Sequence, residues 1–246
     1  MTSGSAGIIS VDRAVSQARK FEEDGADLID IGGESTRPET WSDAGLPASE
    51  ELRRVVPVVE QVAAVVGIPV SIDTYKAEVA QQAVAAGARL INDVWGLRRD
   101  PRMAATVAAT GMPVVLMHNQ PGGGYDDVIG DISRSLLESV AIAHAAGIAD
   151  DRIIADPGIG FGKTPEQNLE IIRRLPELRS LGFPLLVGPS RKSFIGKTLD
   201  LPIDERLEGT AGAVALSIAG GADIIRVHDV KAMVRVARMV DAIVRA

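Results

Sequence analysis

Seven short stretches of this 246-residue chain place polar or charged groups at the ends of apolar runs, where they could bind or polarise a ligand. Carboxylates and an amide suit a flat heterocycle with N–H donors, whereas guanidinium and ammonium groups bind phosphate oxygens strongly. We therefore predict one pocket with a heterocycle half and an anion half. The first half is drawn from Asp73, Asn92 and Asp156, and the second from Thr36, Arg37, Lys192, Arg226 and His228.

One of these stretches is a loop with alternating glycines, Asp156-Pro-Gly-Ile-Gly-Phe-Gly-Lys163. Its ending, Gly162-Lys163-Thr164, is typical of a phosphate-binding loop, but that motif requires a further glycine five positions before Gly162. Pro157 occupies that position, so the nucleotide-binding interpretation fails on spacing. We predict that this loop brings its backbone close to a ligand beside Asp156. We expect Lys163 to lie on the surface.

The elements that must position these groups are short apolar runs alternating with segments of helical spacing. Strands are predicted at about residues 28–31, 69–74, 90–94, 113–118, 153–156, 184–188 and 224–229. Helices are predicted over about residues 11–24, 48–66, 76–86, 101–109, 165–181, 205–219 and 231–245, with a long one ending at 146. This alternation indicates parallel βα units.

We predict an α/β fold, a (β/α)₈ TIM barrel forming a single domain over residues 8–246 after a flexible start at residues 1–7. An open doubly wound sheet is the alternative. A barrel collects the residues that follow its strands at one end, which would bring the seven stretches together. The sequence predicts seven strands rather than eight, and the missing one is the first.

Composition excludes several classes of function. The net charge of -7 argues against a nucleic-acid surface, and no apolar run approaches the length of a membrane span. The absence of cysteine excludes disulfides and thiolate metal sites, and the three histidines show no zinc-ligand spacing. A magnesium ion held partly by a diphosphate fits the anion half. We expect a cytoplasmic protein, since the start lacks the pattern of a signal peptide.

Seven motifs, in order along nearly the whole chain, resemble the dihydropteroate synthase family. The resemblance implies a pterin-binding barrel of folate biosynthesis, a transferase that uses Mg²⁺ and is a target of sulfonamides. Such enzymes join 6-hydroxymethyl-7,8-dihydropterin diphosphate to 4-aminobenzoate and release diphosphate and 7,8-dihydropteroate. The motifs are Gly32-Gly-Glu-Ser-Thr-Arg-Pro38, Ser71-Ile-Asp-Thr74, Ile91-Asn-Asp93, Leu116-Met-His118, Asp156-Pro-Gly-Ile-Gly-Phe-Gly-Lys163, Gly188-Pro-Ser-Arg-Lys-Ser193 and Arg226-Val-His-Asp229.

The resemblance also implies a role for each site residue. Asp73, Lys192, Arg226 and His228 would be catalytic, and the pterin would contact Asp73, Asn92, Met117, Asp156 and Lys192. The diphosphate would contact Thr36, Arg226 and His228, and the aminobenzoate Thr36, Arg37, Pro38, Phe161, Lys192 and Ser193. A homodimer is implied as well, and the apolar faces of 214–218 and 234–244 are candidates for its interface.

The chain departs from the family at its start. Family members open with a strand ending Asn-Val-Thr-Pro-Asp-Ser-Phe-Ser-Asp, whose asparagine is the protein ligand to magnesium, and this chain has no such stretch. We therefore assign no metal ligand here, and we expect a truncated or mis-started sequence of reduced activity. Two alternatives remain: a pterin-binding methyltransferase, which has no diphosphate to hold, and a catalytically impaired pterin-binding paralogue.

Overall fold

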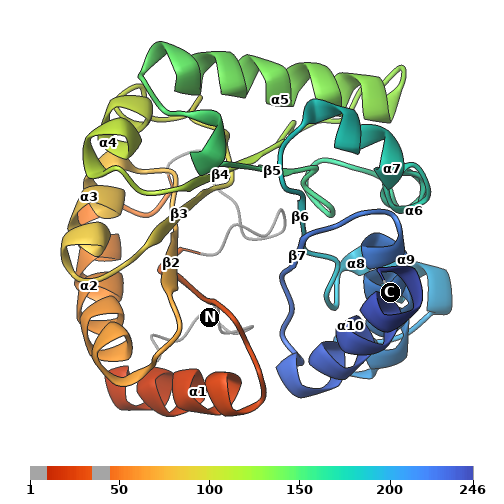
Figure 1. The fold of residues 1–246 in the computed structure, drawn as a ribbon, viewed down its shortest axis with the longest axis horizontal. Helices are drawn as coiled ribbons and strands as arrows, with labels where there is room; N and C mark the ends of the chain where they lie inside the picture. The colour runs from red at the N-terminus through yellow and green to blue at the C-terminus, as the bar shows by residue number, and fades with distance from the viewer. Residues whose placement is uncertain (1–9, 35–44, 246) are drawn as a thin grey trace. The chain divides into compact units, whose positions relative to one another are not determined.

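A computed structural model describes residues 10–34 and 45–245, which divide into two compact units (Figure 1). The described part of the first unit is 10–34, 45–116 and 139–153, and that of the second is 117–138 and 154–245. The expectations for the flexible start, the first strand, and Thr36, Arg37 and Pro38 concern residues outside the described ones. The single-domain assignment of residues 8–246 stays a prediction.

The first unit is built on a parallel sheet. Its strands lie in the order β1 (Ile29–Gly32), β2 (Val70–Asp73), β3 (Leu90–Asp93) and β4 (Val114–Met117), the last residue of which falls in the second unit. Asp73 lies opposite Gly32 on one side and opposite Asn92 on the other. Because the strands are parallel and their register is aligned, the groups that follow them gather at one edge of the sheet.

Helices α1 (Val11–Glu23), α2 (Ala48–Val65), α3 (Ala77–Ala85) and α4 (Met103–Thr110) pack on one another in sequence order beside this sheet (Figure 1). Helix α2 also contacts β1 and β2, burying Val55, Val59 and Val62 at helical spacing. Helix α1 begins after Ser10, whose hydroxyl accepts a hydrogen bond from the backbone N–H of Arg13 at 3.4 Å.

The second unit contains most of the four-residue strand β5 (Ile153–Asp156) and two shorter strands, β6 (Leu186–Val187) and β7 (Ile224–Ile225). Strands β6 and β7 pair in parallel, and Ala155 forms a parallel bridge with Leu185. The helices are α5 (Val128–Ala145), α6 (Pro165–Arg173), α7 (Leu175–Leu178), α8 (Ser193–Leu199), α9 (Leu207–Ala219) and α10 (Val230–Val244), with 3₁₀ turns at Asp150–Arg152, Arg179–Leu181 and Ile203–Glu205. Residues 139–145 of α5, the first 3₁₀ turn and Ile153 fall in the first unit.

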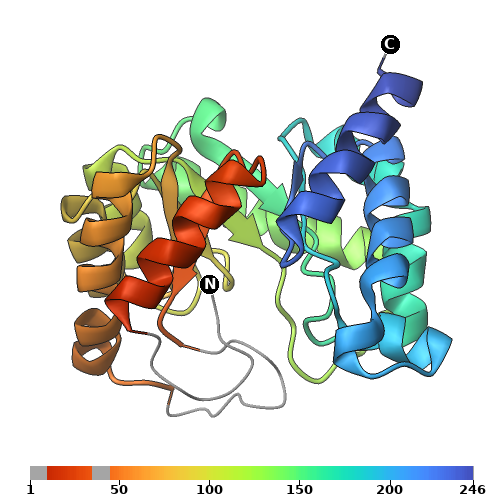
Figure 2. The same ribbon diagram turned by 90° about the horizontal axis from the view of Figure 1, so that it is seen from below.

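An apolar core joins the second unit's strands to its helices. It includes Ala155 and Val187 from the strands, Ile171 and Leu175 from α6 and α7, and Phe194 from α8. A smaller cluster packs α9 against α10, which run side by side (Figure 2). Within the described residues, none of the helices combines the length and apolar character needed to cross a lipid bilayer.

The sequence-based prediction of an α/β fold with parallel strands is confirmed, and each predicted strand has a counterpart among β1 to β7. Two details were wrong. The predicted helix over 165–181 is broken into α6, α7 and a 3₁₀ turn, with Pro176 in the first turn of α7, where a missing N–H costs nothing. Helix α8 was not predicted. Its 7 residues are too few to show a helical period, and burial of Phe194 and Ile195 stabilises it instead.

Candidate active site

The first group of polar side chains lies at the carboxyl ends of β2 and β3. Asp73 and Asn92, each 5% exposed, are register partners there. Asn92 donates from Nδ2 to Asp30 Oδ2 at 3.4 Å, and the hydroxyl of Ser71 donates to Asp30 Oδ1. The buried amide oxygen of Asn92 accepts no hydrogen bond from any described residue. This group therefore offers an acceptor to a ligand that carries N–H donors.

Sequence reasoning missed Asp30 as a member of this group. It is the single charged residue in the apolar run Leu28-Ile-Asp-Ile31, and it lies opposite Ser71 in the register of β1 and β2. A carboxylate inside a buried strand is costly unless it is hydrogen-bonded. That interruption of an apolar run was the signal that could have identified it.

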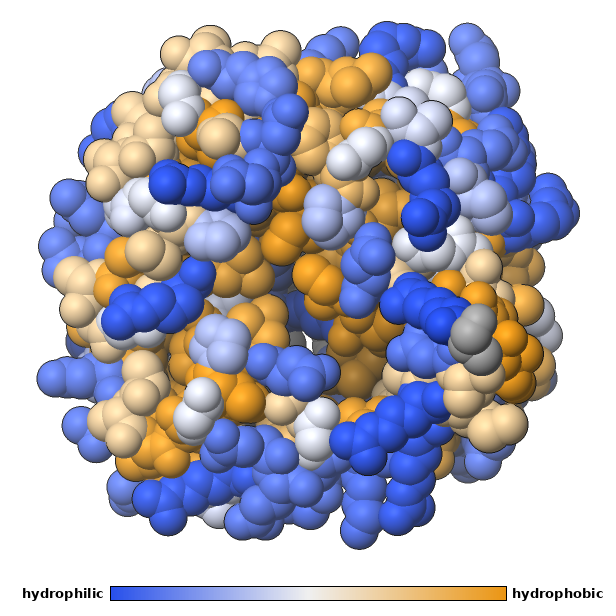
Figure 3. Space-filling model, viewed as in Figure 1, coloured by the Kyte–Doolittle hydropathy of each residue, from blue (hydrophilic) through white to orange (hydrophobic). Residues whose placement is uncertain are grey.

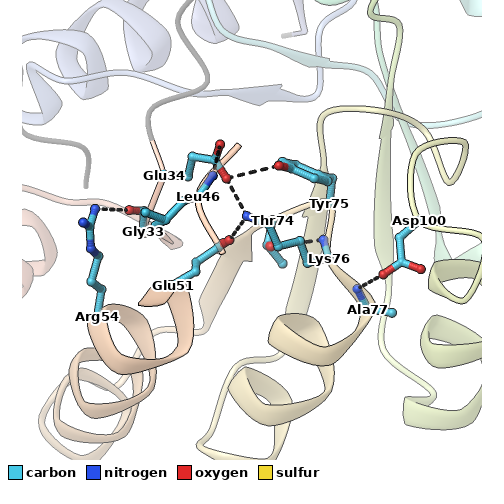
Figure 4. Close-up of polar contacts among 10 residues, drawn as sticks. All are labelled: Gly33, Glu34, Leu46, Glu51, Arg54, Thr74, Tyr75, Lys76, Ala77 and Asp100. Atoms are coloured by element: carbon cyan, nitrogen blue, oxygen red, sulfur yellow. Dashed lines mark hydrogen bonds and ion pairs between the residues drawn. The ribbon is translucent and has the colours of Figure 1, made fainter. Parts of the chain in front are cut away.

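A lysine between two carboxylates fixes the residues that follow β1 and β2 (Figure 4). Lys76 Nζ donates to Glu34 Oε2 at 2.5 Å and also to Glu51 Oε2. Glu34 Oε1 in turn accepts the backbone N–H of Leu46 at 3.0 Å. Glu51 is 1% exposed, and its burial raises the pKa of its carboxyl while Lys76 opposes that rise. The cluster joins α2 to the segments that follow β1 and β2, and sequence reasoning did not find it.

In the second unit, the glycine loop follows β5 in close contact with neighbouring backbone. Gly158, Gly160 and Gly162 have φ values of 69°, 82° and 59°, the left-handed region that favours glycine. A Cβ on Gly158 or Gly162 would overlap the carbonyl oxygen of His118 or of Gln120, and one on Gly160 would overlap the side chain of Lys192. The alternating glycines thus let the loop pack against these groups, whereas the close approach to a ligand that the sequence indicated stays a prediction.

Lys163 is not a surface lysine, contrary to our expectation. Its ammonium donates to the carbonyl oxygens of Gly158 at 2.9 Å, Phe161 at 3.0 Å and His118 at 3.5 Å. Burial lowers its pKa to about 7, although Asp156 opposes that change. Hydrogen bonds to backbone inside the glycine loop draw this side chain inward, and a sequence reading has no access to them.

Lys192 reaches the same loop from the residues before α8. Its ammonium donates to the carbonyl oxygen of Ile159 and lies 4.4 Å from the centre of the Phe161 ring. The preceding residue, Arg191, has a left-handed φ of 55°, which is strained for a side chain of this size. A bidentate pair from Arg191 to Asp229 and a hydrogen bond from its backbone N–H to Thr210 hold that conformation.

Asp156 lies among cations in this unit. It is 7% exposed, and burial raises the pKa of its carboxyl. The backbone N–H of Gly158, which donates to Oδ1 at 2.7 Å, opposes this rise, as do the charges of Lys192, Lys163 and Arg226. A buried acceptor with cations beside it suits a ligand with both N–H donors and an anionic group.

Comparison with known proteins shows to which family this chain belongs. Residues 2–228 match the pterin binding enzyme family. The chain is 50% identical to the dihydropteroate synthase of Bacillus subtilis, over 95% of this chain and 81% of that protein. The chain belongs to the dihydropteroate synthase family.

Solved structures of dihydropteroate synthases agree in fold. One from Clostridium difficile, determined in the presence of pteroic acid, matches with a TM-score of 0.93 and 47% identity over 96% of this chain and 89% of that one. One from Yersinia pestis, in a sulfonamide drug complex, matches with a TM-score of 0.94 and 40% identity over 99% of this chain and 90% of that one.

The structure divides the residues expected from the dihydropteroate synthase pattern between the units. Asp73 and Asn92 lie together in the first unit, whereas the rest of the described set lies in the second. There, Met117 is buried at the end of β4, Ser193 is exposed at the start of α8, and His228 bonds Ser190 through Nδ1 and Oγ at 3.0 Å. Lys192, Phe161 and Asp156 are brought together around the glycine loop. Thr36, Arg37 and Pro38 lie outside the described residues.

The described residues were considered as possible ligands of a metal ion. Within residues 10–34 and 45–245, no three or more His, Asp or Glu side chains are grouped so that they could hold a metal ion. A magnesium ion prefers an octahedron of oxygens and commonly takes several of them from substrate phosphates and water. The described part of the chain therefore supplies no complete set of magnesium ligands by itself.

Proposed function

We propose that the chain is a working dihydropteroate synthase whose two substrates meet at the residues assigned above. The observation that carries the proposal is the surroundings of Asp156: a buried carboxylate with Lys192, Lys163 and Arg226 near enough to favour its ionised form. Membership of the dihydropteroate synthase family supplies the reaction. The product, 7,8-dihydropteroate, keeps the pterin and the aminobenzoate and loses the diphosphate.

The proposed reaction exchanges one bond for another at the pterin methylene. The C–O bond to the diphosphate breaks and its electron pair leaves with the oxygen, so positive charge develops on the pterin. A C–N bond then forms to the amine of 4-aminobenzoate, which releases one proton. Asp73 stabilises the developing cation, and Arg226 and His228 stabilise the departing anion, which is electrostatic catalysis at both ends of the breaking bond.

The proposed substrate contacts divide into those to the pterin, those to the diphosphate and those to the aminobenzoate. The pterin ring is read by Asp73, Asn92 and Asp156, with Met117 against its face and Lys192 beside it. The diphosphate binds Arg226 and His228 with Thr36. The aminobenzoate lies near Phe161, Lys192 and Ser193, together with Thr36, Arg37 and Pro38. Magnesium belongs to this proposal as a partner of the diphosphate, as the family implies.

The proposal includes a single (β/α)₈ barrel over residues 8–246, a cytoplasmic location and a homodimer. The dimer is supported by a hydrophobic surface on the last two helices, beside the C terminus (Figure 3). Leu216 of α9 and Met239 and Ile243 of α10 are each more than 60% exposed. Large exposed apolar side chains gathered on one face are typical of a protein–protein interface.

The rival activity, methyl transfer from a pterin, requires no diphosphate site. Lys192 and Arg226 near Asp156 provide a cationic region that such an enzyme would not need. A catalytically impaired paralogue would bind the pterin as the proposed enzyme does and would differ from it only in its lack of turnover. Neither rival has a structural observation in its favour.

An assay of diphosphate release separates these possibilities. The protein is mixed with pterin diphosphate, magnesium and 4-aminobenzoate, and release is compared with that of Lys192→Met and of Lys197→Met, a control at an exposed lysine of α8. We expect turnover by the wild type, a loss of about a hundredfold in Lys192→Met, and little change in the control. Pterin binding without turnover would support the impaired paralogue, and absence of both would contradict the family function.

A further inference from the structure

Lys163 is a partly buried cation to which the proposed reaction assigns no substrate contact. Its ammonium has three N–H donors. It contacts three carbonyl oxygens, two within the glycine loop (Gly158 and Phe161) and one directly after β4 (His118). Because its donors point into the backbone, Lys163 is placed to shape the loop rather than to contact a substrate.

We propose that Lys163 is a positioning residue, which holds the glycine loop of residues 157–163 against residues 118–120 and so sets the orientation of Phe161 and Asp156. The inference rests on the proposed function for its catalytic consequence, and on the contacts of Lys163 for its structural consequence. Gly158 and Lys163 face the same carbonyl of His118, so the lysine closes the contact that the glycine permits.

A second side chain, that of Asn168, also fixes the loop. Asn168 of α6, which is 2% exposed, accepts the backbone N–H of Gly160 at its Oδ1 at 2.6 Å. Its Nδ2 donates to the carbonyls of Thr164 at 2.7 Å and Lys163 at 3.3 Å. Thr164 also forms a capping box with Gln167, which fixes the start of α6. Asn168 fixes the loop to α6, and Lys163 fixes it to the residues after β4.

The charge of Lys163 reaches the site as well. Lys163, Lys192 and Arg226 each favour the ionised form of Asp156. Lys163 itself faces Asp156, Lys192 and, at 5.9 Å from its ring centre, Tyr125. Removing the ammonium would therefore leave Asp156 with one cation fewer, and its carboxyl would ionise at a higher pH.

The test compares Lys163→Met with wild type and with Lys197→Met. Amide hydrogen exchange of the peptide covering 157–164 reports loop position without any need for activity. We expect exchange there to rise about tenfold in Lys163→Met, while the rest of the second unit changes little. We also expect kcat/KM for 4-aminobenzoate to fall about a hundredfold, the cost of a misplacement of about 1 Å. The acid limb of the pH profile of kcat/KM should move to higher pH in Lys163→Met, because the carboxyl of Asp156 would ionise at a higher pH.

Loop exchange within twofold of wild type in Lys163→Met would overturn the inference. Equal acceleration of exchange in both units would also overturn it, because it would make Lys163 a general determinant of stability. Lys163→Gln, which keeps two N–H donors on a shorter stem, replaces Lys163→Met if the latter does not fold, and the same outcomes apply. Absence of turnover in the wild type would contradict the proposed function but not the role of Lys163, which the hydrogen-exchange comparison tests independently of activity.

Discussion

Buried carboxylates in this chain differ in what compensates their charge. Asp156 has nearby cations, whereas Asp93 is stabilised mainly by backbone N–H groups. Asp93 accepts from Trp95 at 2.9 Å and from Leu97 at 2.8 Å, and so supports a turn in which Leu97 has a φ of 66°. Burial raises the pKa of Asp93 to about 6, because these hydrogen bonds do not fully replace solvation.

This pKa predicts a pH dependence of stability. The folded pKa of Asp93 lies above its unfolded value of 3.8, so its contribution is complete below about pH 4 and is lost as pH rises through about 6. The loss is up to about 3 kcal/mol at 1.36 kcal/mol per pKa unit. Urea unfolding of wild type and Asp93→Asn at pH 4.5 and 7.5 measures it. The wild type's advantage over the variant should shrink at the higher pH, and parallel profiles would refute the assignment.

At the scale of elements, side chains from one element hold the end of another. The pair Arg191–Asp229 links the segment before α8 to the start of α10, and Asn168 links α6 to the glycine loop. The Lys76 cluster links α2 to the segments that follow β1 and β2. Parallel strands of the first unit place Asp73 and Asn92 at one edge of its sheet, and the Lys76 cluster fixes the segments that follow β1 and β2 there.

The Lys76 cluster allows a double-variant experiment. Lys76→Met leaves the buried carboxylate of Glu51 without its cation, and we expect a loss of about 3–5 kcal/mol in the free energy of unfolding. Glu51→Leu combined with Lys76→Met removes both charges and should recover most of that loss. Urea denaturation measures both, with Lys20→Met in the exposed Lys20–Asp24 pair as the control. An additive loss in the double variant would contradict the buried ion pair.

For the whole molecule, the net negative charge and the exposed apolar side chains of α9 and α10 are the features that bear on assembly. The net charge of -7 favours solubility and opposes binding to nucleic acid. The exposed apolar side chains of these helices are the surface on which the proposed homodimer depends. The two halves of a symmetric dimer would each contribute the same helices.

Charge placed on that face should therefore separate the proposed dimer. Leu216→Glu with Ile243→Glu puts two carboxylates on exposed positions that are outside the active site, so folding should be retained. Sedimentation velocity should show a dimer for wild type and a monomer for the variant. Leu137→Glu, on an exposed residue of α5, is the matched control and should remain dimeric. A wild-type monomer would exclude the homodimer.

The amino-acid sequence by itself determined the order of strands and helices and the residues that follow each strand. Apolar residues repeat with a period of 2 in strands and 3.6 in helices, because those positions face the same side of the element. These periods can be recognised in the sequence alone. The alternating glycines of 158–162 indicated a loop of unusual backbone conformation. Their φ values are left-handed, a region in which glycine has the lowest strain. The motifs were specific enough to identify the dihydropteroate synthase family before any geometry was considered.

Only the tertiary structure decided which polar groups contact one another. Lys163 was expected on the surface, yet it donates to a carbonyl 45 positions earlier in the chain, and Lys76 meets carboxylates 25 and 42 positions earlier. Asp30 and Asn168 have roles that depend on partners across a sheet or a loop. Such contacts are set by packing between elements distant in sequence, and no local pattern encodes them. The glycine motif predicted a close approach of backbone to a ligand, and only the fold showed that this loop packs against the carbonyl groups of His118 and Gln120 and receives hydrogen bonds from Lys163.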